Sequence, residues 1–78
     1  MKDVEIFTGP GCAHCGAAKA LLEEHGVPFT ERDVSDADVL AELQTRVPRA
    51  RSIPQIFADG QHLGTEQDLR LALSDAER

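Results

Sequence analysis

Apolar and polar positions along the chain follow two periods, one typical of strands and one typical of helices. Segments rich in apolar or β-branched residues at 4–7, 29–34 and 53–58, with a shorter one at 61–63, predict four strands. Asp59-Gly60, between the last two, is a strong hairpin signal. In the remaining segments apolar positions recur at i, i+3 and i+4, the spacing of one helical face. The pattern therefore predicts the element order β-α-β-α-β-β-α.

The first predicted helix begins near Cys12, directly after a short turn. Its apolar face is formed by Ala18, Leu21, Leu22 and His25. Gly26 is a typical residue just past a helix end, and Pro28 excludes a continuation. A strand, a helix and a strand within about 30 residues predict a βαβ unit with parallel strands.

The other two helices each begin with the [Ser/Thr]-x-x-[Asp/Glu] signature of a capping box. One signature is Ser35 with Asp38, and the other is Thr65 with Asp68. Pro48 ends the helix that follows Ser35. We expect the core-facing positions of these two helices to be Leu40, Leu43, Val47, Leu69, Ala72, Leu73 and Ala76.

Size and charge narrow the class of protein. The chain has 78 residues, which is enough for one domain over residues 1–78. Its formal net charge of −6 argues against a partner that is a nucleic acid or an anionic membrane. No apolar run approaches the ~20 residues of a membrane span. We expect a cytoplasmic monomer that binds neither membrane nor nucleic acid.

The chain has two cysteines, Cys12 and Cys15, at the start of the first helix. A bridge between them would close almost no loop, so it would add little stability by loop entropy. A thiolate at a helix start is stabilised by unpaired N–H groups and the helix dipole, which lowers the cysteine pKa below its usual ~8.5. We therefore expect Cys12 to act as the nucleophile and the more shielded Cys15 as the resolving thiol.

The residue between the two cysteines that carries chemistry is His14. Partial positive charge near the Cys12 thiolate would stabilise the reduced form and make the disulfide more oxidising. A metal site is the alternative, since Cys12, His14 and Cys15 could supply three ligands. Structural zinc needs four ligands, and the chain has no second Cys-x-x-Cys motif. We expect no metal, although a site shared by two chains stays open.

Several motifs together resemble those of glutaredoxins, a family with the thioredoxin fold. They are Cys12-Ala13-His14-Cys15, the helix segment 18–22, Ser52-Ile53-Pro54-Gln55-Ile56-Phe57, and the turn 59–64 followed by Asp68-Leu69. The resemblance implies an α/β fold with a four-stranded mixed sheet flanked by helices. It also implies a thiol–disulfide oxidoreductase that reduces protein or glutathione mixed disulfides. No tightly bound cofactor is implied, and glutathione is expected as a co-substrate.

The resemblance also assigns roles to residues outside the cysteine motif. It implies a cis peptide bond between Ile53 and Pro54, which exposes backbone groups opposite the dithiol. Arg49 or Arg51 would bind a carboxylate of glutathione. The turn formed by Thr65, Glu66 and Gln67 would meet the γ-glutamyl end of the tripeptide. His14 would lie beside Cys12 in the same binding region.

Because the sequence departs from the family pattern at three places, a reductant other than glutathione remains an alternative. The usual Cys-Pro-Tyr-Cys is changed to Cys-Ala-His-Cys, no lysine stands among residues 8–11, and the usual Gly-Gly turn is Gly64-Thr65. These changes favour, modestly, a redoxin that thioredoxin reductase recharges. A non-enzymatic metal or iron–sulfur carrier is a further alternative.

Overall fold

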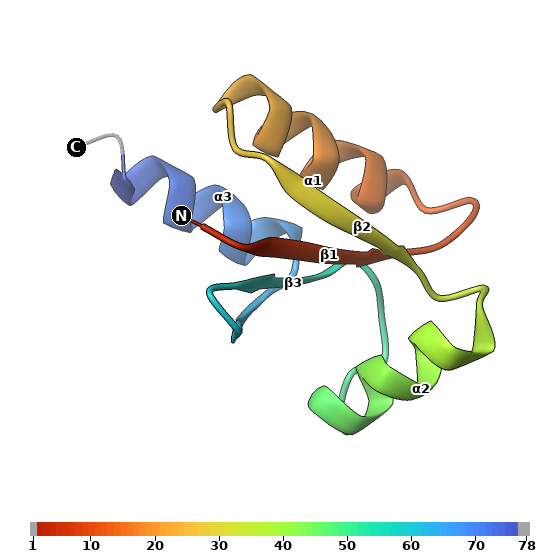
Figure 1. Cartoon of the computed structure of the whole chain (residues 1–78). Coiled ribbons are helices and arrows are strands. Elements are labelled where there is room, and N and C mark those ends of the chain that lie inside the picture. Colours follow the sequence, from red (N-terminus) through yellow and green to blue (C-terminus); the bar gives the residue numbers. More distant parts are fainter. Residues whose placement is uncertain (1, 77–78) are drawn as a thin grey trace.

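The computed structural model describes residues 2–76, which fold into one four-stranded sheet with helices on both of its faces (Figure 1). In chain order the elements are β1 (Val4–Thr8), α1 (Ala13–Glu24), β2 (Phe29–Asp33), α2 (Ala37–Arg46), β3 (Gln55–Ala58), β4 (Gln61–Gly64) and α3 (Glu66–Ala76). The element order and the α/β class that the sequence predicts are confirmed.

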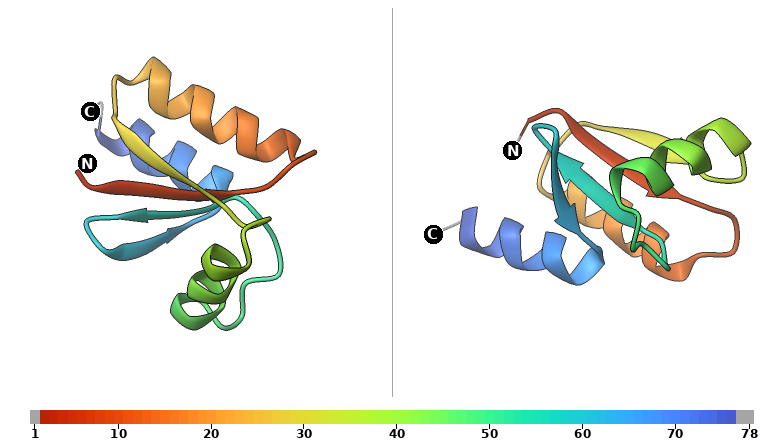
Figure 2. Two further views of the ribbon diagram at one scale, coloured as in Figure 1. Left: turned by 45° about the vertical axis from the view of Figure 1, so that its right-hand side comes forward. Right: turned by 90° about the horizontal axis from the view of Figure 1, so that it is seen from below.

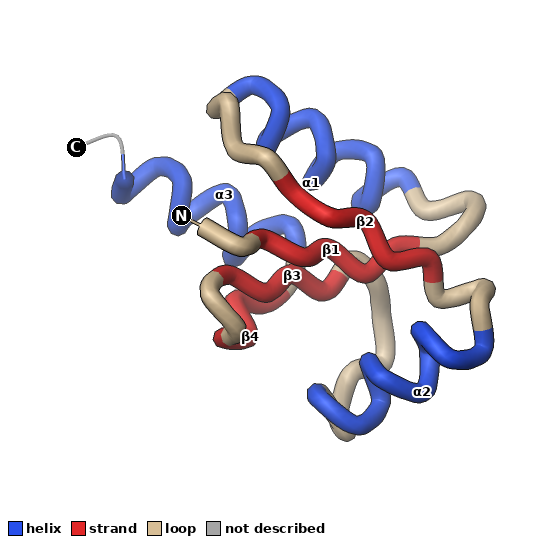
Figure 3. The backbone as a smooth tube through the Cα atoms, in the orientation of Figure 1, coloured by secondary structure: helices blue, strands red, loops and turns tan. Residues whose placement is uncertain are grey.

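The sheet has the strand order β2-β1-β3-β4, which Figure 3 shows with the strands in red. β1 pairs with β2 in parallel, as the βαβ prediction requires, and pairs with β3 in antiparallel orientation. β3 and β4 form the predicted hairpin. Its turn residues Asp59 and Gly60 both have positive φ, at 54° and 79°, which suits the right-handed twist of a hairpin. The sheet is therefore mixed, with β1 and β3 in its centre.

One face of the sheet is covered by α1 and α3, and the other by α2 (Figure 2). Alternate residues of β1 point to opposite faces, so Ile6 packs under α1 and α3 while Phe7 packs under α2. The cluster under α1 and α3 consists of Val4, Ile6, Ala18, Leu21, Leu22, Ile56, Leu69 and Leu73. This aliphatic core fixes the helix that carries the two cysteines.

The cluster under α2 is smaller and more aromatic. Its buried members are Phe7, Leu43 and Phe57, and the two phenylalanine rings meet edge to face with centroids 5.7 Å apart. The guanidinium carbon of Arg46 lies 3.8 Å from the centroid of the Phe57 ring. Arg32 binds Glu42 across the same face at 2.7 Å. Charged groups thus cover aromatic rings on this side of the sheet.

Two expectations for α2 are wrong. Leu40 is 39 % exposed, because it lines an open hollow between α2 and residues 50–53, and Val39 packs against the cluster under α2 instead. The N-cap is Asp36, whose carboxylate accepts from the Asp38 N–H, while the Ser35 N–H donates to Asp33. Leu43 is buried and Val47 packs against the cluster, as expected.

In the second half of the chain the third strand is shorter than the predicted range 53–58, whereas the described side chains of the last helix agree with the prediction. The third strand begins at Gln55, so Ile53 and Pro54 belong to the preceding loop. In α3, Leu69 and Leu73 are buried and Ala72 is half-buried, while the side chain of Ala76 lies outside the described residues. No helix within residues 2–76 is long and apolar enough to cross a bilayer.

Candidate active site

The two cysteines occupy different environments at the start of α1. Cys12 is the N-cap of the helix and is half-buried, and its Sγ accepts a hydrogen bond from the Cys15 N–H at 3.1 Å. Cys15 lies one turn further in and is 2 % exposed. The two sulfurs are joined in a disulfide. A thiolate at Cys12 would keep the hydrogen bond from the Cys15 N–H. This bond stabilises negative charge on the more accessible of the two sulfurs.

The loop before β3 lies against Cys12. The peptide bond between Ile53 and Pro54 is cis, as the family resemblance implies, and the Ile53 carbonyl oxygen is 3.6 Å from Cys12 Sγ. A Cβ on Gly9 would lie 2.8 Å from Ile53 Cδ1, so only glycine lets the side chain of Ile53 pack on the turn after β1. Backbone groups of this loop are therefore held beside the accessible sulfur.

A chain of hydrogen bonds fixes the same loop from β4. The Gln55 side chain donates to the Ser52 carbonyl oxygen at 2.9 Å, which leaves its own oxygen as an acceptor. His62 Nε2–H donates to that oxygen at 2.7 Å. Gln55 is 5 % exposed, so both of its polar atoms have partners where water is scarce.

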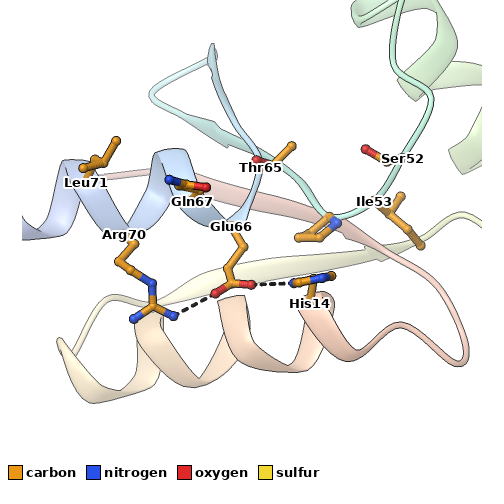
Figure 4. A pocket seen from close by; sticks show the side chains of 9 residues that line it. His14, Ser52, Ile53, Thr65, Glu66, Gln67, Arg70 and Leu71 are labelled. Carbon is orange, nitrogen blue, oxygen red and sulfur yellow. Dashed lines mark hydrogen bonds and ion pairs between the residues drawn. The ribbon is translucent and has the colours of Figure 1, made fainter.

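A groove of about 600 Å³ opens beside the loop that holds Ile53 (Figure 4). It lies between the first turn of α1, the Ser52–Pro54 loop and the start of α3. Its lining consists of His14, Ser52, Ile53, Pro54, Thr65, Glu66, Gln67, Arg70 and Leu71. Neither cysteine is among these lining residues, but Ile53 contacts Cys12, so the groove approaches the accessible sulfur at Ile53.

A row of three charged or titratable side chains crosses the groove. His14 Nδ1 is 2.8 Å from Glu66 Oε1, and Arg70 Nη2 is 2.7 Å from Glu66 Oε2. Figure 4 shows Glu66 between the other two side chains, with both contacts drawn as dashed lines. The hydrogen bond from Arg70, and then the one from His14, holds the pKa of Glu66 below its ordinary value. Glu66 is therefore ionised at neutral pH.

The backbone at the start of α3 is shaped by Gly64 and Asp68. Gly64 has φ at 130°, and a Cβ there would lie 2.6 Å from the Asp68 carboxyl carbon. The Asp68 carboxylate accepts from the Thr65 N–H at 2.9 Å, as the capping-box signature predicts. This turn brings Thr65, Glu66 and Gln67 to the wall of the groove.

Most of the sequence-predicted binding residues line this one groove, and two do not. His14, Ile53 and Pro54 meet the predicted turn at Thr65, Glu66 and Gln67 there. Arg49 and Arg51 are exposed and do not line the groove. Arg51 instead lines a separate hollow of about 250 Å³ between α2 and residues 50–53. No contact in residues 2–76 joins His14 to Cys12, so the role of His14 in tuning the Cys12 thiolate stays a prediction.

Sequence reasoning missed Ser52, Arg70 and Leu71 as lining residues of the groove. One signal could have found Arg70, because it stands four residues after Glu66 and i, i+4 Glu–Arg pairs meet on a helix. No local sequence pattern predicts the hydrogen bonds that run from His62 through Gln55 to Ser52, because these bonds depend on how β3 pairs with β4.

Comparison with known proteins decides the family. The family model described as Glutaredoxin matches residues 4–63, which include the Cys12–Cys15 pair and the Ile53–Pro54 loop. The chain belongs to the glutaredoxin family. Members of this family are thiol–disulfide oxidoreductases, and the chain carries their dithiol as Cys12 and Cys15.

Individual relatives agree with the family match. The chain is 39 % identical over 69 residues to glutaredoxin 3 of Escherichia coli K12, a stretch that covers 88 % of this chain and 83 % of the relative. It is 44 % identical to the glutaredoxin of Brucella melitensis in solution, with a TM-score of 0.73 over 97 % of this chain and 82 % of that one. A glutathione complex of buckwheat glutaredoxin has a TM-score of 0.79 at 20 % identity, covering 95 % and 70 % of the two chains. That last likeness shows the fold alone.

Possible metal ligands are not grouped within the described part of the chain. Residues 2–76 hold no cluster of three or more His, Cys, Asp or Glu side chains that could bind an ion. The two sulfurs at Cys12 and Cys15 are bonded to each other.

Proposed function

We propose that the protein reduces mixed disulfides between glutathione and other thiols, with Cys12 as the attacking sulfur. The observation that carries this proposal is the asymmetry of the pair: Cys12 is accessible and accepts the Cys15 N–H at 3.1 Å, while Cys15 is 2 % exposed. Only the thiolate of the accessible cysteine can meet a disulfide in the groove. The buried cysteine is placed to attack Cys12 afterwards.

The reaction proceeds in balanced exchange steps. The Cys12 thiolate attacks the glutathione sulfur of the mixed disulfide, the Cys12–glutathione bond forms, and the other thiol leaves with the electron pair of the broken bond. Cys15 then attacks Cys12 and expels glutathione, which produces the Cys12–Cys15 disulfide that the structure contains. Two molecules of glutathione reduce this disulfide and leave as oxidised glutathione.

The groove supports binding of the tripeptide. Its walls offer backbone groups at Ile53 for an extended peptide and N–H groups at the start of α3 for a carboxylate. A glutaredoxin from buckwheat was solved as a complex with glutathione and has the same fold.

The test is reduction of a small glutathione mixed disulfide, followed through glutathione reductase and NADPH. We expect Cys12→Ser to abolish the activity. Cys15→Ser should keep part of it, because free glutathione can resolve the intermediate on Cys12. The proposal is wrong if the wild-type protein is no faster than Cys12→Ser.

Recharging by thioredoxin reductase is the second candidate. It is favoured by the exposed positions of Arg49 and Arg51 outside the groove, because neither of the arginines expected to bind a carboxylate of glutathione lines it. NADPH oxidation by thioredoxin reductase with this protein as the only disulfide substrate would support it. Absence of oxidation, with glutathione-dependent turnover present, would exclude it.

A further inference from the structure

The Arg70–Glu66–His14 row joins the active-site turn to α3 across 52 residues of sequence. Glu66 is 17 % exposed and uses one carboxylate oxygen for each neighbour, whereas His14 is 78 % exposed. Two elements that pack on the same face of the sheet are thus bridged across the groove (Figure 4).

The row determines which nitrogen of His14 carries a proton. An ionised carboxylate has no proton to donate, so His14 Nδ1–H must donate to Glu66 Oε1. Arg70 binds the other oxygen and keeps the carboxylate ionised. Nε2 is therefore the nitrogen left for a substrate, and it makes no hydrogen bond to a group within residues 2–76.

The charged or titratable groups near His14 belong to α3 and to the cysteine motif at the start of α1. Glu66 contacts it directly and Arg70 lies behind Glu66, while Cys12 and Cys15 flank it in sequence. Residues 52–54 of the facing loop carry no charge, and Arg49 and Arg51 do not line the groove. Because the Glu66 carboxylate offsets the charge of a protonated His14, the pair supplies little net positive charge to the Cys12 thiolate, whereas Nε2 has no hydrogen-bond partner within residues 2–76 and can meet a substrate.

We propose that His14, held by Glu66, donates the Nε2 proton to the thiolate that leaves the substrate disulfide, and that Glu66 is a positioning residue for this transfer. The inference rests on the proposed attack of Cys12 on a mixed disulfide. The substrate sulfur–sulfur bond breaks, its electron pair stays on the leaving sulfur, and the imidazolium supplies the proton that makes it a free thiol. The ring is left neutral, with Nδ1–H still bonded to Glu66.

The groove places the participants together. The leaving sulfur lies beyond the attacked sulfur as seen from Cys12, and Cys12 contacts Ile53, which lines the groove. His14 lines the same groove and stands two residues after Cys12. We expect a substrate disulfide that Cys12 attacks to extend its leaving sulfur toward the groove that His14 lines.

The experiment varies the leaving thiol. Two glutathione mixed disulfides are compared, one with an alkyl thiol, whose thiolate is strongly basic, and one with an aryl thiol, whose thiolate is stable without a proton at neutral pH. Proton donation helps only the alkyl substrate. We expect His14→Gln to lower kcat/KM about 10-fold for the alkyl substrate and less than about 2-fold for the aryl one. This is below the ~10²–10⁴ typical of general acid catalysis, because a thiolate leaves more easily than an alkoxide or an amide.

Glu66→Gln tests the positioning role. The amide keeps an oxygen acceptor but can also turn its NH₂ group toward Nδ1, so the proton is no longer confined to one tautomer. We expect Glu66→Gln to lower kcat/KM about 3-fold for the alkyl substrate and to leave kcat/KM for the aryl substrate unchanged. The loss is smaller than the whole effect of general acid catalysis, because His14 is still present. Glu23→Gln, an exposed position on α1, is the matched control that removes one charge outside the groove.

The outcomes separate the explanations. A loss confined to the alkyl substrate supports the proposal, and its partial recovery for His14→Ala on addition of free imidazole supports it further. An equal loss with both substrates would show a structural or thiolate-stabilising role and overturn it, as would no loss with either. If the wild-type protein is no faster than Cys12→Ser on both substrates, the proposed function itself fails.

Discussion

The two faces of the sheet are held by different forces. Under α1 and α3, eight buried residues form a core that contains no charged side chain. Under α2, three buried residues are covered by Arg32 and Arg46, which pair with Glu5 and Glu42. The dithiol and the groove stand on the aliphatic side, and the charged side carries the loop that leads to Ile53.

This difference shows which interactions hold the helix that begins at the two cysteines. Burial of aliphatic surface involves no charged or titratable group, so we expect the packing of α1 on the sheet to depend less on pH and salt than the packing of α2 does. Ion pairs and cation–π contacts at a partly exposed surface weaken with salt and with acid. We therefore expect α2 to loosen before α1 does, and four measurements test this contrast.

The largest effect is expected in the aliphatic core. Leu22 is fully buried in α1, so Leu22→Ala removes apolar contacts and leaves a cavity. The expected loss is about 2–5 kcal/mol in the free energy of unfolding, measured by chemical denaturation. Leu40→Ala on α2 is the matched control, because this side chain is 39 % exposed and should cost much less. Equal losses would remove the contrast between the two faces.

Arg46 is the side chain whose loss should weaken the α2 face most. It lies over the Phe57 ring at 3.8 Å and binds Glu5 at 2.9 Å. We expect Arg46→Ala to cost about 1–2 kcal/mol in the free energy of unfolding, with the activity at saturating substrate unchanged. Arg49→Ala, which removes an exposed arginine nearby, should stay within about 0.5 kcal/mol of wild type. If Arg49→Ala lowered the free energy of unfolding as much, the effect of Arg46→Ala would be explained by the change in net charge and not by its local contacts.

Salt should reduce the effect of one variant and not of the other. At 1 M salt the Debye length is about 3 Å, so the difference between wild type and Arg46→Ala should shrink by a few tenths of a kcal/mol. The difference for Leu22→Ala should be the same at low and high salt. Denaturation curves at both salt concentrations measure this, and a parallel change in the two variants would contradict it.

Acid should have the smallest effect, and its sign follows from the pKa of Glu42. The hydrogen bond from Arg32, followed by that from Arg46, holds the pKa of Glu42 below its ordinary value. A lowered folded-state pKa adds stability above the ordinary pKa of about 4.3, which is lost as pH falls through the lower folded value. Unfolding curves between pH 5 and pH 3 should therefore show a smaller fall in stability for Glu42→Gln than for wild type.

Glu24→Gln is the control for that measurement. Glu24 is an exposed residue on α1, with no ion pair to the described residues. Its replacement should leave the acid dependence as in wild type. If Glu24→Gln flattens the curve as much as Glu42→Gln does, the ion pairs on the α2 face do not determine the acid response.

Local signals in the sequence predicted most of the fold. Turn chemistry placed the hairpin at Asp59 and Gly60, and the helix start at Cys12 was confirmed as an N-cap. Errors arose where several residues compete for one role. The N-cap of α2 is Asp36 and not Ser35, and Val39 packs against the core where Leu40 was expected to do so. The start of a helix determines which of its side chains face the core.

The candidate site was predicted less completely, because its contacts join distant segments. Ile53 and Pro54 could be placed by family resemblance, and the structure brings them to His14. The contact between His14 and Glu66 depends on how α1 packs against α3, which no local pattern specifies. The same holds for Arg51, which the family resemblance assigned to glutathione binding and which lines a different hollow in the structure.

The outer strands of the sheet bear on how the molecule behaves at high concentration. β2 and β4 each leave one edge without a neighbouring strand, and such edges invite pairing between molecules. β2 carries Glu31, Arg32 and Asp33 in a row, and β4 has four residues. Charge on one edge and short length on the other discourage edge-to-edge aggregation. Backbone groups of the Ile53–Pro54 loop can therefore take part in disulfide exchange while the edges of the sheet discourage polymerisation.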